Sequence, residues 1–274
     1  MDCVVRGIPV AYEEVGSGRP LLMLHGRPGD HRLMSHNLEP ILEARRGWRR
    51  LYPDLPGMGR TPAADWIHSQ DEILDVVLGF LDSVAPRERF ALAAASYGGY
   101  LARGILAKRA PEVDGLFLWA PAVSLGDAAA RRLPTHHTLV HDPATVADLS
   151  PDERAWLGVS VVQSPATLAA FRDAVKPGLL AADQAFMERV AARDMFSFDL
   201  APAGGPFPGP TLVVCGRQDA ICGYADAWEL LENLPRATFA VLDRAGHGLA
   251  AEQPALFRVL VSEWLDRVEE YIAR

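Results

Sequence analysis

The sequence is poor in cysteine. Its 274 residues include only Cys3, Cys215 and Cys222, an odd number that is far too small for a disulfide framework. A reducing compartment is therefore expected. The amino terminus agrees, because residues 1–6 show no basic region followed by a long apolar one, as a secretion signal would. Together these absences predict a cytoplasmic protein.

Long apolar runs and blocks of like charge are also missing. No stretch reaches the roughly 18 apolar residues that a membrane-spanning helix requires. The formal net charge of −8 at pH 7 is spread along the chain, which argues against nucleic acid or an anionic membrane as the main partner. A small-molecule ligand that is neutral or weakly charged is the better expectation.

What the chain does have is a regular alternation of strand-like and helix-like segments. Strands are expected at 4–15 (a hairpin around Gly7), 20–25, 48–52, 92–95, 113–120, 211–215 and 238–242. Helices are expected at 33–44, 69–83, 97–109, 226–234 and 253–271. This order predicts an α/β fold with a doubly wound, mostly parallel sheet, helices on both faces, and a ligand site at the carboxyl ends of the strands.

Two of these helices carry specific signals. Ser69 followed by Glu72 predicts a capping box at the start of the helix at 69–83. In the helix at 253–271, apolar residues recur at helical spacing on one side, at Leu256, Leu260, Trp264 and Val268.

The alternation lapses between residues 123 and 210. Helical stretches are expected at 165–175 and 182–193, but no convincing buried strand precedes Thr211. A structureless loop of that length is implausible in a compact domain. We therefore predict an inserted helical cap at 123–203 on a core made of residues 1–122 and 204–274. The cap is expected to cover the mouth of the sheet and supply the apolar wall of a pocket.

The pattern of residues 92–100 predicts a strand, a sharp turn and a helix, with one serine at the turn. A serine in such a turn has its hydroxyl pushed out of the sheet edge, and the positions two before and two after it must be small. Ala94 and Gly98 meet that demand, although Ala94 replaces the glycine of the usual pattern. The stretch indicates a nucleophile elbow centred on Ser96.

A serine hydroxyl is a poor nucleophile near neutral pH, so it needs a base and a group that orients the base. Asp219 follows the strand at 211–215 and His247 follows the strand at 238–242, which places both at the same sheet edge as Ser96. The order Ser96, Asp219, His247, each one loop beyond a strand, is that of the α/β-hydrolase triad.

The sequence resembles the α/β-hydrolase superfamily over nearly the whole chain apart from the insertion. Residues 25–29 (His-Gly-Arg-Pro-Gly) resemble the family's oxyanion loop, and residues 54–59 its turn after the next strand. Gly246 and His247, with residues 252–254 (Glu-Gln-Pro), resemble its catalytic histidine segment.

That resemblance implies a role for each site residue. Ser96 would be the nucleophile, His247 the general base and then acid, and Asp219 the orienting carboxylate. The backbone N–H groups of Arg27 and Tyr97 would form the oxyanion hole. A serine at position 96, where some relatives carry aspartate, argues against a haloalkane dehalogenase or an epoxide hydrolase.

Several residues compete for these roles. Asp127, just past the preceding strand, is a rival triad acid because some family members draw the acid from there. His25 competes with His247, but in the family pattern it is a structural residue that holds the oxyanion loop. The Arg27 side chain is expected either near the pocket, where it would favour carboxylate-bearing substrates, or in a surface pair with Asp30.

No metal or cofactor is predicted. His136, His137 and His141 have no carboxylate or cysteine at ligand spacing, which favours a surface position. Gly57 and Gly59 lack the full spacing and the lysine of a phosphate loop, so a tight turn is the better interpretation.

The sequence therefore predicts a cofactor-independent serine hydrolase that cleaves a small, largely apolar ester, lactone, thioester or amide through an acyl-enzyme on Ser96. Two alternatives use the same triad: a cofactor-free perhydrolase or haloperoxidase that makes a peracid, and a carbon–carbon bond hydrolase acting on a diketone-like substrate. A third alternative is a ligand receptor of the same fold, which would bind in the same cavity and signal through its cap.

Overall fold

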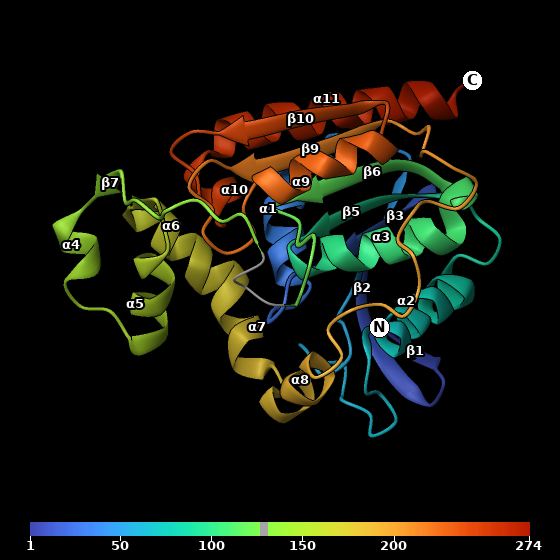
Figure 1. The fold of residues 1–274 in the computed structure, drawn as a ribbon, viewed down its shortest axis with the longest axis horizontal. Helices are drawn as coiled ribbons and strands as arrows, with labels where there is room; N and C mark the ends of the chain where they lie inside the picture. The colour runs from blue at the N-terminus through green and yellow to red at the C-terminus, as the bar shows by residue number, and fades with distance from the viewer. Residues whose placement is uncertain (127–130) are drawn as a thin grey trace.

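The structure, a computed structural model, describes residues 1–126 and 131–274. An eight-stranded sheet runs through it in the order β1-β2-β4-β3-β5-β6-β9-β10 (Figure 1). The strands are β1 (Asp2–Val5), β2 (Ile8–Gly16), β3 (Arg19–Leu24), β4 (Trp48–Pro53), β5 (Phe90–Ala95), β6 (Val113–Trp119), β9 (Thr211–Gly216) and β10 (Ala237–Leu242). Only β2 pairs antiparallel with its neighbours, β1 and β4; every other pair in this sheet is parallel. The predicted doubly wound, mostly parallel sheet is confirmed.

Helices cover both faces of this sheet. On one face α2 (Gln70–Val84) and α3 (Tyr97–Arg109) share a buried cluster with Phe90, Leu92 and Ala94 of β5. On the other face α1 (Arg32–Leu42) and α11 (Pro254–Ile272) share a second cluster with the remaining β5 residues, Ala91, Ala93 and Ala95. Successive side chains of a strand point to opposite faces, so a strand covered on both sides reads as an unbroken apolar run.

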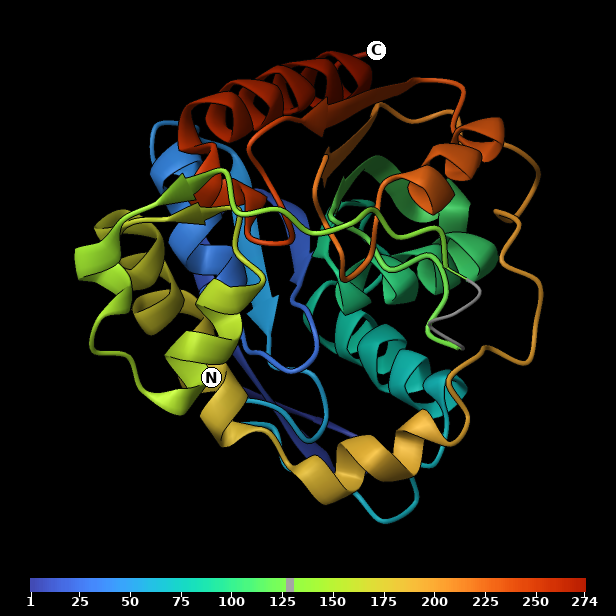
Figure 2. The same ribbon diagram turned by 60° about the vertical axis from the view of Figure 1, so that its left-hand side comes forward.

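The segment between β6 and β9 contributes α4 (Pro143–Val146), α5 (Pro151–Gly158), α6 (Pro165–Ala170), a π-helical turn (Phe171–Val175), α7 (Lys176–Ala181) and α8 (Gln184–Ala191). Much of it lies beyond the carboxyl ends of the parallel strands (Figures 1 and 2). The expectation that no buried strand lies between residues 123 and 210 is wrong in one detail: β7 (Val140–His141) and the buried β8 (Val162–Gln163) form a short parallel pair. Two residues are too few to show a strand period in a sequence.

Two helical details differ from expectation. Ser69 caps α2 and accepts a hydrogen bond from the Glu72 N–H, but the Glu72 carboxylate accepts from the His68 N–H, one residue before the capping residue. In α11 the buried face is Phe257, Val261, Trp264, Leu265 and Val268, whereas Leu256 is 49% exposed. The predicted stripe is therefore wrong at its start. The aromatic ring of Phe257 packs against Trp119 and Phe117, which fixes the rotation of the helix.

The remaining elements are α9 (Ala225–Trp228), two 3₁₀ turns (Ala110–Glu112 and Glu229–Asn233) and α10 (Leu249–Glu252). Among the described residues, no helix combines the length and the apolar character that crossing a membrane demands.

The turn from β5 into α3 brings this helix against the end of β3. Ser96 has a φ of +50°, in the left-handed region that residues with a side chain rarely adopt. A Cβ atom on Gly98 would lie 2.3 Å from the carbonyl oxygen of Leu24, which is closer than atoms can approach. Only glycine therefore fits at position 98.

We expect Gly98→Ala to lower the free energy of unfolding by at least about 1–3 kcal/mol, because helix and strand must separate to admit the methyl group. Denaturant unfolding measures the change. Gly158→Ala is the matched control, since a Cβ atom at Gly158 would meet nothing within 4 Å. It should leave stability unchanged or raise it by up to about 1 kcal/mol. Equal effects of the two substitutions would contradict the close approach.

Candidate active site

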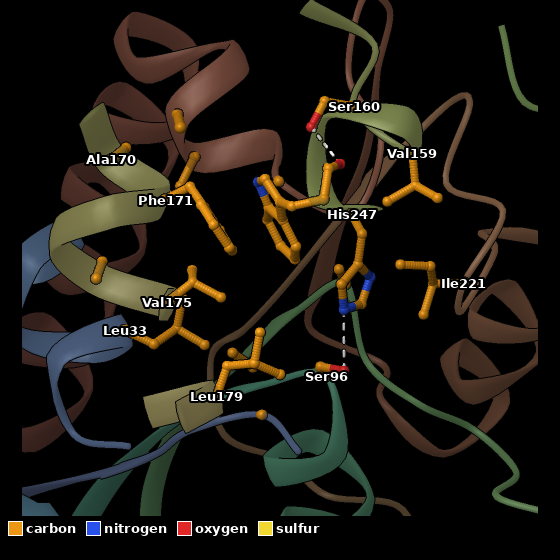
Figure 3. Close-up of a pocket in the computed structure, with 18 of the residues that line it drawn as sticks. Leu33, Ser96, Val159, Ser160, Ala170, Phe171, Val175, Leu179, Ile221 and His247 are labelled. Carbon is orange, nitrogen blue, oxygen red and sulfur yellow. Dashed lines mark hydrogen bonds between the residues drawn. The ribbon is translucent and has the colours of Figure 1, made fainter. Parts of the chain in front are cut away.

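Three loops at the carboxyl edge of the sheet bring Ser96, Asp219 and His247 together. Ser96 stands at the β5–α3 turn, Asp219 follows β9, and His247 follows β10. The Ser96 hydroxyl oxygen lies 3.0 Å from Nε2 of His247 (Figure 3), and Nδ1 of His247 lies 3.0 Å from a carboxylate oxygen of Asp219. The three residues thus form one continuous line of hydrogen bonds.

The Asp219 carboxylate is fully buried and well supplied with donors. Its Oδ1 atom accepts from the backbone N–H groups of Ile221, at 2.8 Å, and Cys222, at 3.0 Å, while Oδ2 faces His247. Burial alone would raise the pKa of Asp219. The charge of His247 and these hydrogen bonds outweigh burial and lower the pKa, so the group is held as a carboxylate.

The imidazole of His247 is oriented by this carboxylate. Burial disfavours the imidazolium, but the neighbouring Asp219 charge outweighs burial and raises the pKa of His247 well above 6.5. An ionised carboxylate only accepts hydrogen bonds, so Nδ1 must carry a proton. In neutral His247 the other nitrogen, Nε2, is then free to accept the proton of the Ser96 hydroxyl.

Two glycines, Gly216 before the Asp219 loop and Gly246 in the His247 loop, lie in close contact. A Cβ atom on Gly216, at the end of β9, would lie 2.3 Å from the carbonyl oxygen of Gly246. On its other side, Gly246 donates its N–H to the buried carboxylate of Glu252 at 2.6 Å. The contact fixes the position of the residue directly before His247.

Glu252 also binds the segment between β6 and β9. Its Oε1 atom accepts from the N–H groups of Val161, at 2.6 Å, and Val162, at 3.2 Å. Burial raises the pKa of Glu252 even though three N–H groups donate to it. One carboxyl group therefore joins the His247 loop to β8. The sequence motif at 252–254 marks this residue, but it gave no hint of the partners at 161 and 162.

The backbone N–H groups of Arg27 and Tyr97 are the expected oxyanion hole, and Arg27 lines the same cavity as Ser96. Tyr97 is the next residue and opens α3, and a Cβ atom on Gly26 would lie 3.2 Å from the Ser96 Cβ atom. Within the part of the chain that the structure describes, neither N–H donates a hydrogen bond. Among the described residues, both N–H groups are thus left without a hydrogen-bond acceptor.

His25 holds the loop that carries Arg27. Its buried ring donates from Nδ1 to the carbonyl of Gly26 at 2.8 Å and accepts at Nε2 from the N–H of Leu55 at 3.0 Å. Burial lowers the pKa of His25, in keeping with a neutral ring. The ring bonds to the backbone of Gly26 and Leu55, in keeping with the structural role that the family resemblance implied.

The Arg27 side chain does not pair with Asp30, so that alternative is wrong. Asp30 forms its ion pair with Arg32, two residues along the chain. Arg27 instead reaches Asp194, at 3.3 Å, in the segment that follows α8. No local sequence signal pointed to Asp194, which is 167 residues away from Arg27.

A cavity of about 450 Å³ opens over Ser96. Phe171, Val175 and Leu179 line it on one side of the Ser96–His247 pair, and Ile221 and Val159 lie on the other side (Figure 3). The π-helical turn and α5 supply a stacked pair of rings, Phe171 and Trp156, with centroids 5.3 Å apart. The cavity has the size and apolar lining of a small-molecule site.

Cys222 is a further residue at this site that sequence reasoning did not single out. Its sulfur lies 3.8 Å from the Ser96 hydroxyl oxygen, and its backbone N–H donates to Asp219. Its place three residues after Asp219 was the available signal. The rival acid, Asp127, lies outside the described residues.

Among the described residues, one buried cluster has the composition of a metal site: Asp30, His31 and Asp54. Its carboxylates are already engaged, Asp30 by Arg32 and Asp54 by His31 and Arg60. These contacts account for the cluster as an ion-pair network. Of the three histidines in the insertion, His137 and His141 are exposed and His136 is half-buried.

Comparison with known proteins gives one consistent result. The sequence model of the family described as "Alpha/beta hydrolase family" matches residues 21–258. The chain is similar to the AB hydrolase superfamily protein YisY of Bacillus subtilis, with 24% identity over 94% of this chain and 95% of the relative. It is also similar to the 2-hydroxymuconate semialdehyde hydrolase of Pseudomonas sp. strain CF600, with 27% identity over 96% of this chain and 93% of the relative.

Among solved structures, an alpha/beta superfamily hydrolase from Oenococcus oeni PSU-1 superposes with a TM-score of 0.86. The two chains are 24% identical, and the match covers 95% of this chain and 96% of the other.

The electrostatics of the site predict how His247 titrates. In a proton NMR titration we expect its ring signal to move with a midpoint above pH 6.5, because the Asp219 carboxylate stabilises the imidazolium. Asp219→Asn removes that charge, the largest of the influences that raise the pKa of His247, so the midpoint should fall. His247→Gln identifies the signal by its disappearance. A midpoint that is unchanged in Asp219→Asn would contradict this account of the site.

Proposed function

This chain belongs to the alpha/beta hydrolase family, and on that premise we propose that it is a serine hydrolase. Its substrate would be a small, largely apolar ester, lactone, thioester or amide, cleaved through an acyl-enzyme on Ser96. The observation that carries the proposal is the line of hydrogen bonds from Ser96 through His247 to Asp219 beneath an apolar cavity.

Acylation begins when Nε2 of His247 takes the proton of the Ser96 hydroxyl. The oxygen then attacks the acyl carbon, and the carbonyl becomes a tetrahedral oxyanion. The protonated imidazole gives its proton to the leaving alcohol, thiol or amine as the carbon–heteroatom bond breaks. Asp219, ionised and buried, stabilises the imidazolium and holds the ring in the required tautomer.

Deacylation repeats these steps with water as the nucleophile. His247 takes a proton from water, the hydroxide attacks the acyl carbon, and the proton returns to the Ser96 oxygen as the acyl bond breaks. In both halves the oxyanion would accept from the backbone N–H groups of Arg27 and Tyr97. Each such donor is typically worth about 10²- to 10³-fold in kcat.

The insertion would act as a lid. Residues from α5, the π-helical turn and α7 supply much of the apolar wall above Ser96. Such a wall favours the acyl or leaving group of an uncharged substrate and excludes water from the charged intermediate. Assigning residues 123–203 to a lid and the rest to the core is part of the proposal.

A fluorophosphonate probe followed by peptide mass spectrometry tests the proposal. The probe should label Ser96, because its hydroxyl lies 3.0 Å from Nε2 of His247 and the other ring nitrogen of His247 faces the Asp219 carboxylate. Turnover of a short-chain 4-nitrophenyl ester should fall by about 10⁴-fold or more in Ser96→Ala and His247→Ala. In Asp219→Asn it should fall by about 10⁴-fold with KM largely kept.

These losses should not add in double variants, because the three groups act as a unit. An unlabelled Ser96, or a Ser96→Ala protein with undiminished turnover, refutes the serine hydrolase. A protein that resists the probe yet binds a small apolar ligand tightly supports the receptor alternative instead.

A second candidate is a carbon–carbon bond hydrolase that uses the same three residues. It is favoured by the similarity to 2-hydroxymuconate semialdehyde hydrolase over 96% of this chain. The compound in that relative's name has no ester or amide bond, so its hydrolysis breaks a carbon–carbon bond. Measuring kcat/KM for 2-hydroxymuconate semialdehyde and for a neutral ester separates the two candidates. The substrate of the preferred reaction should have a kcat/KM that is higher by orders of magnitude.

A further inference from the structure

Four side chains form a closed ring behind the two proposed oxyanion donors. The Tyr97 hydroxyl donates to the Gln70 amide oxygen at 2.6 Å, and the Gln70 amide nitrogen donates to Oδ1 of Asp194 at 3.2 Å. Arg27 donates to the same Asp194 oxygen at 3.3 and 3.4 Å. The ring closes where the Arg27 guanidinium lies 4.8 Å over the Tyr97 ring.

The members of this ring are shielded from water. Gln70 is 0% and Tyr97 2% exposed, and the Arg27 and Asp194 side chains are about one-fifth exposed, at 20% and 19%. A buried polar group that loses its partner keeps the cost of desolvation, so each bond in such a ring supports the next. The ring is therefore a stiff unit rather than a set of surface contacts.

The ring joins four distant parts of the chain. Arg27 belongs to the loop after β3, Tyr97 opens α3, and Gln70 opens α2. Asp194 comes from the segment after α8, at the end of the insertion. Arg27 and Tyr97 are the two residues whose N–H groups would bind the oxyanion. The ring therefore contacts the side chains of both residues that would supply the donors.

We propose that Gln70 and Asp194 are positioning residues for the oxyanion hole, an inference that rests on the proposed serine hydrolase. A catalytic donor must stand within about 0.5 Å of its productive position. Gln70 fixes the Tyr97 side chain and Asp194 fixes that of Arg27, and the bond between Gln70 and Asp194 sets the two donors relative to each other. Because Asp194 belongs to the insertion, the oxyanion hole would be fully supported only when this segment is packed so that Asp194 contacts Arg27 and Gln70.

The experiment compares ground-state binding with binding of the oxyanion. Gln70→Leu, Asp194→Ala and Tyr97→Phe each break the ring at a different point. For each we would measure kcat and KM with a 4-nitrophenyl ester, and the inhibition constant of an alkyl trifluoromethyl ketone, whose adduct with serine carries an oxyanion. We expect kcat to fall about tenfold with KM unchanged, and the inhibition constant to rise by the same factor.

Two further variants separate positioning from general loss of structure. Asp194→Asn keeps an oxygen that can accept from Arg27 and Gln70, so it should recover most of the activity that Asp194→Ala loses. Tyr52→Phe is the matched control for Tyr97→Phe, because the buried Tyr52 hydroxyl donates to Glu39 and belongs to no part of the ring. It should leave kcat and the inhibition constant unchanged, even if it lowers the melting temperature.

The outcomes are distinct. The positioning role would be overturned by wild-type kinetics in Tyr97→Phe and Asp194→Ala. It would also be overturned if the ring variants raised KM alone, or if Tyr52→Phe lost as much kcat as Tyr97→Phe. If Gln70→Leu fails to fold, Tyr97→Phe and Asp194→Ala still decide, since each removes a different member of the ring. Failure of the proposed function looks different: the wild-type protein itself would neither react with a fluorophosphonate nor cleave the ester.

Discussion

The site depends on the close approach between the start of α3 and the end of β3. A glycine at position 98 allows the helix to begin against the Leu24 carbonyl, and this forces Ser96 into a turn with a φ of +50°. The same contact brings the N–H of Tyr97, the first residue of the helix, close to the loop that leaves β3 and carries Arg27. One steric constraint thus positions Ser96 and the first residue of α3, Tyr97, before any polar interaction between them is considered.

The parallel sheet then brings the other groups to the same place. The loops after β5, β9 and β10 leave the sheet at one edge, because the three strands run in one direction. Asp219 and His247 need only short loops to reach Ser96. Those loops are held in turn by a contact between glycines and by the carboxyl group of Glu252. Residues far apart in the sequence are therefore held in fixed relative positions, because short loops connect them to a rigid sheet.

Local features explain what the sequence could predict. Ser96, Asp219 and His247 each come within five residues of the end of an apolar strand, so their shared edge can be inferred without knowledge of side-chain packing. The partner of Arg27 could not be inferred in this way. Asp30 is its neighbour in sequence, yet Asp30 pairs with Arg32, and the Arg27 partner is Asp194 at the far end of the insertion. The rotation of α11 was missed for the same reason, since two adjacent rows of apolar residues fit the helical period and only packing against β6 selects one.

The carboxyl group of Glu252 has a consequence for how such proteins diversify. It accepts hydrogen bonds from N–H groups of both the His247 loop and the segment around β8, so the stretch between β6 and β9 cannot be exchanged freely for another. A transplanted segment that presented no N–H groups at this point would leave the buried Glu252 carboxyl group without two of its three backbone donors. Side chains that line the cavity can therefore change most easily in α5 and the π-helical turn. Substitutions there leave the backbone hydrogen bonds of residues 161 and 162 to Glu252 in place, whether they arise in evolution or by design.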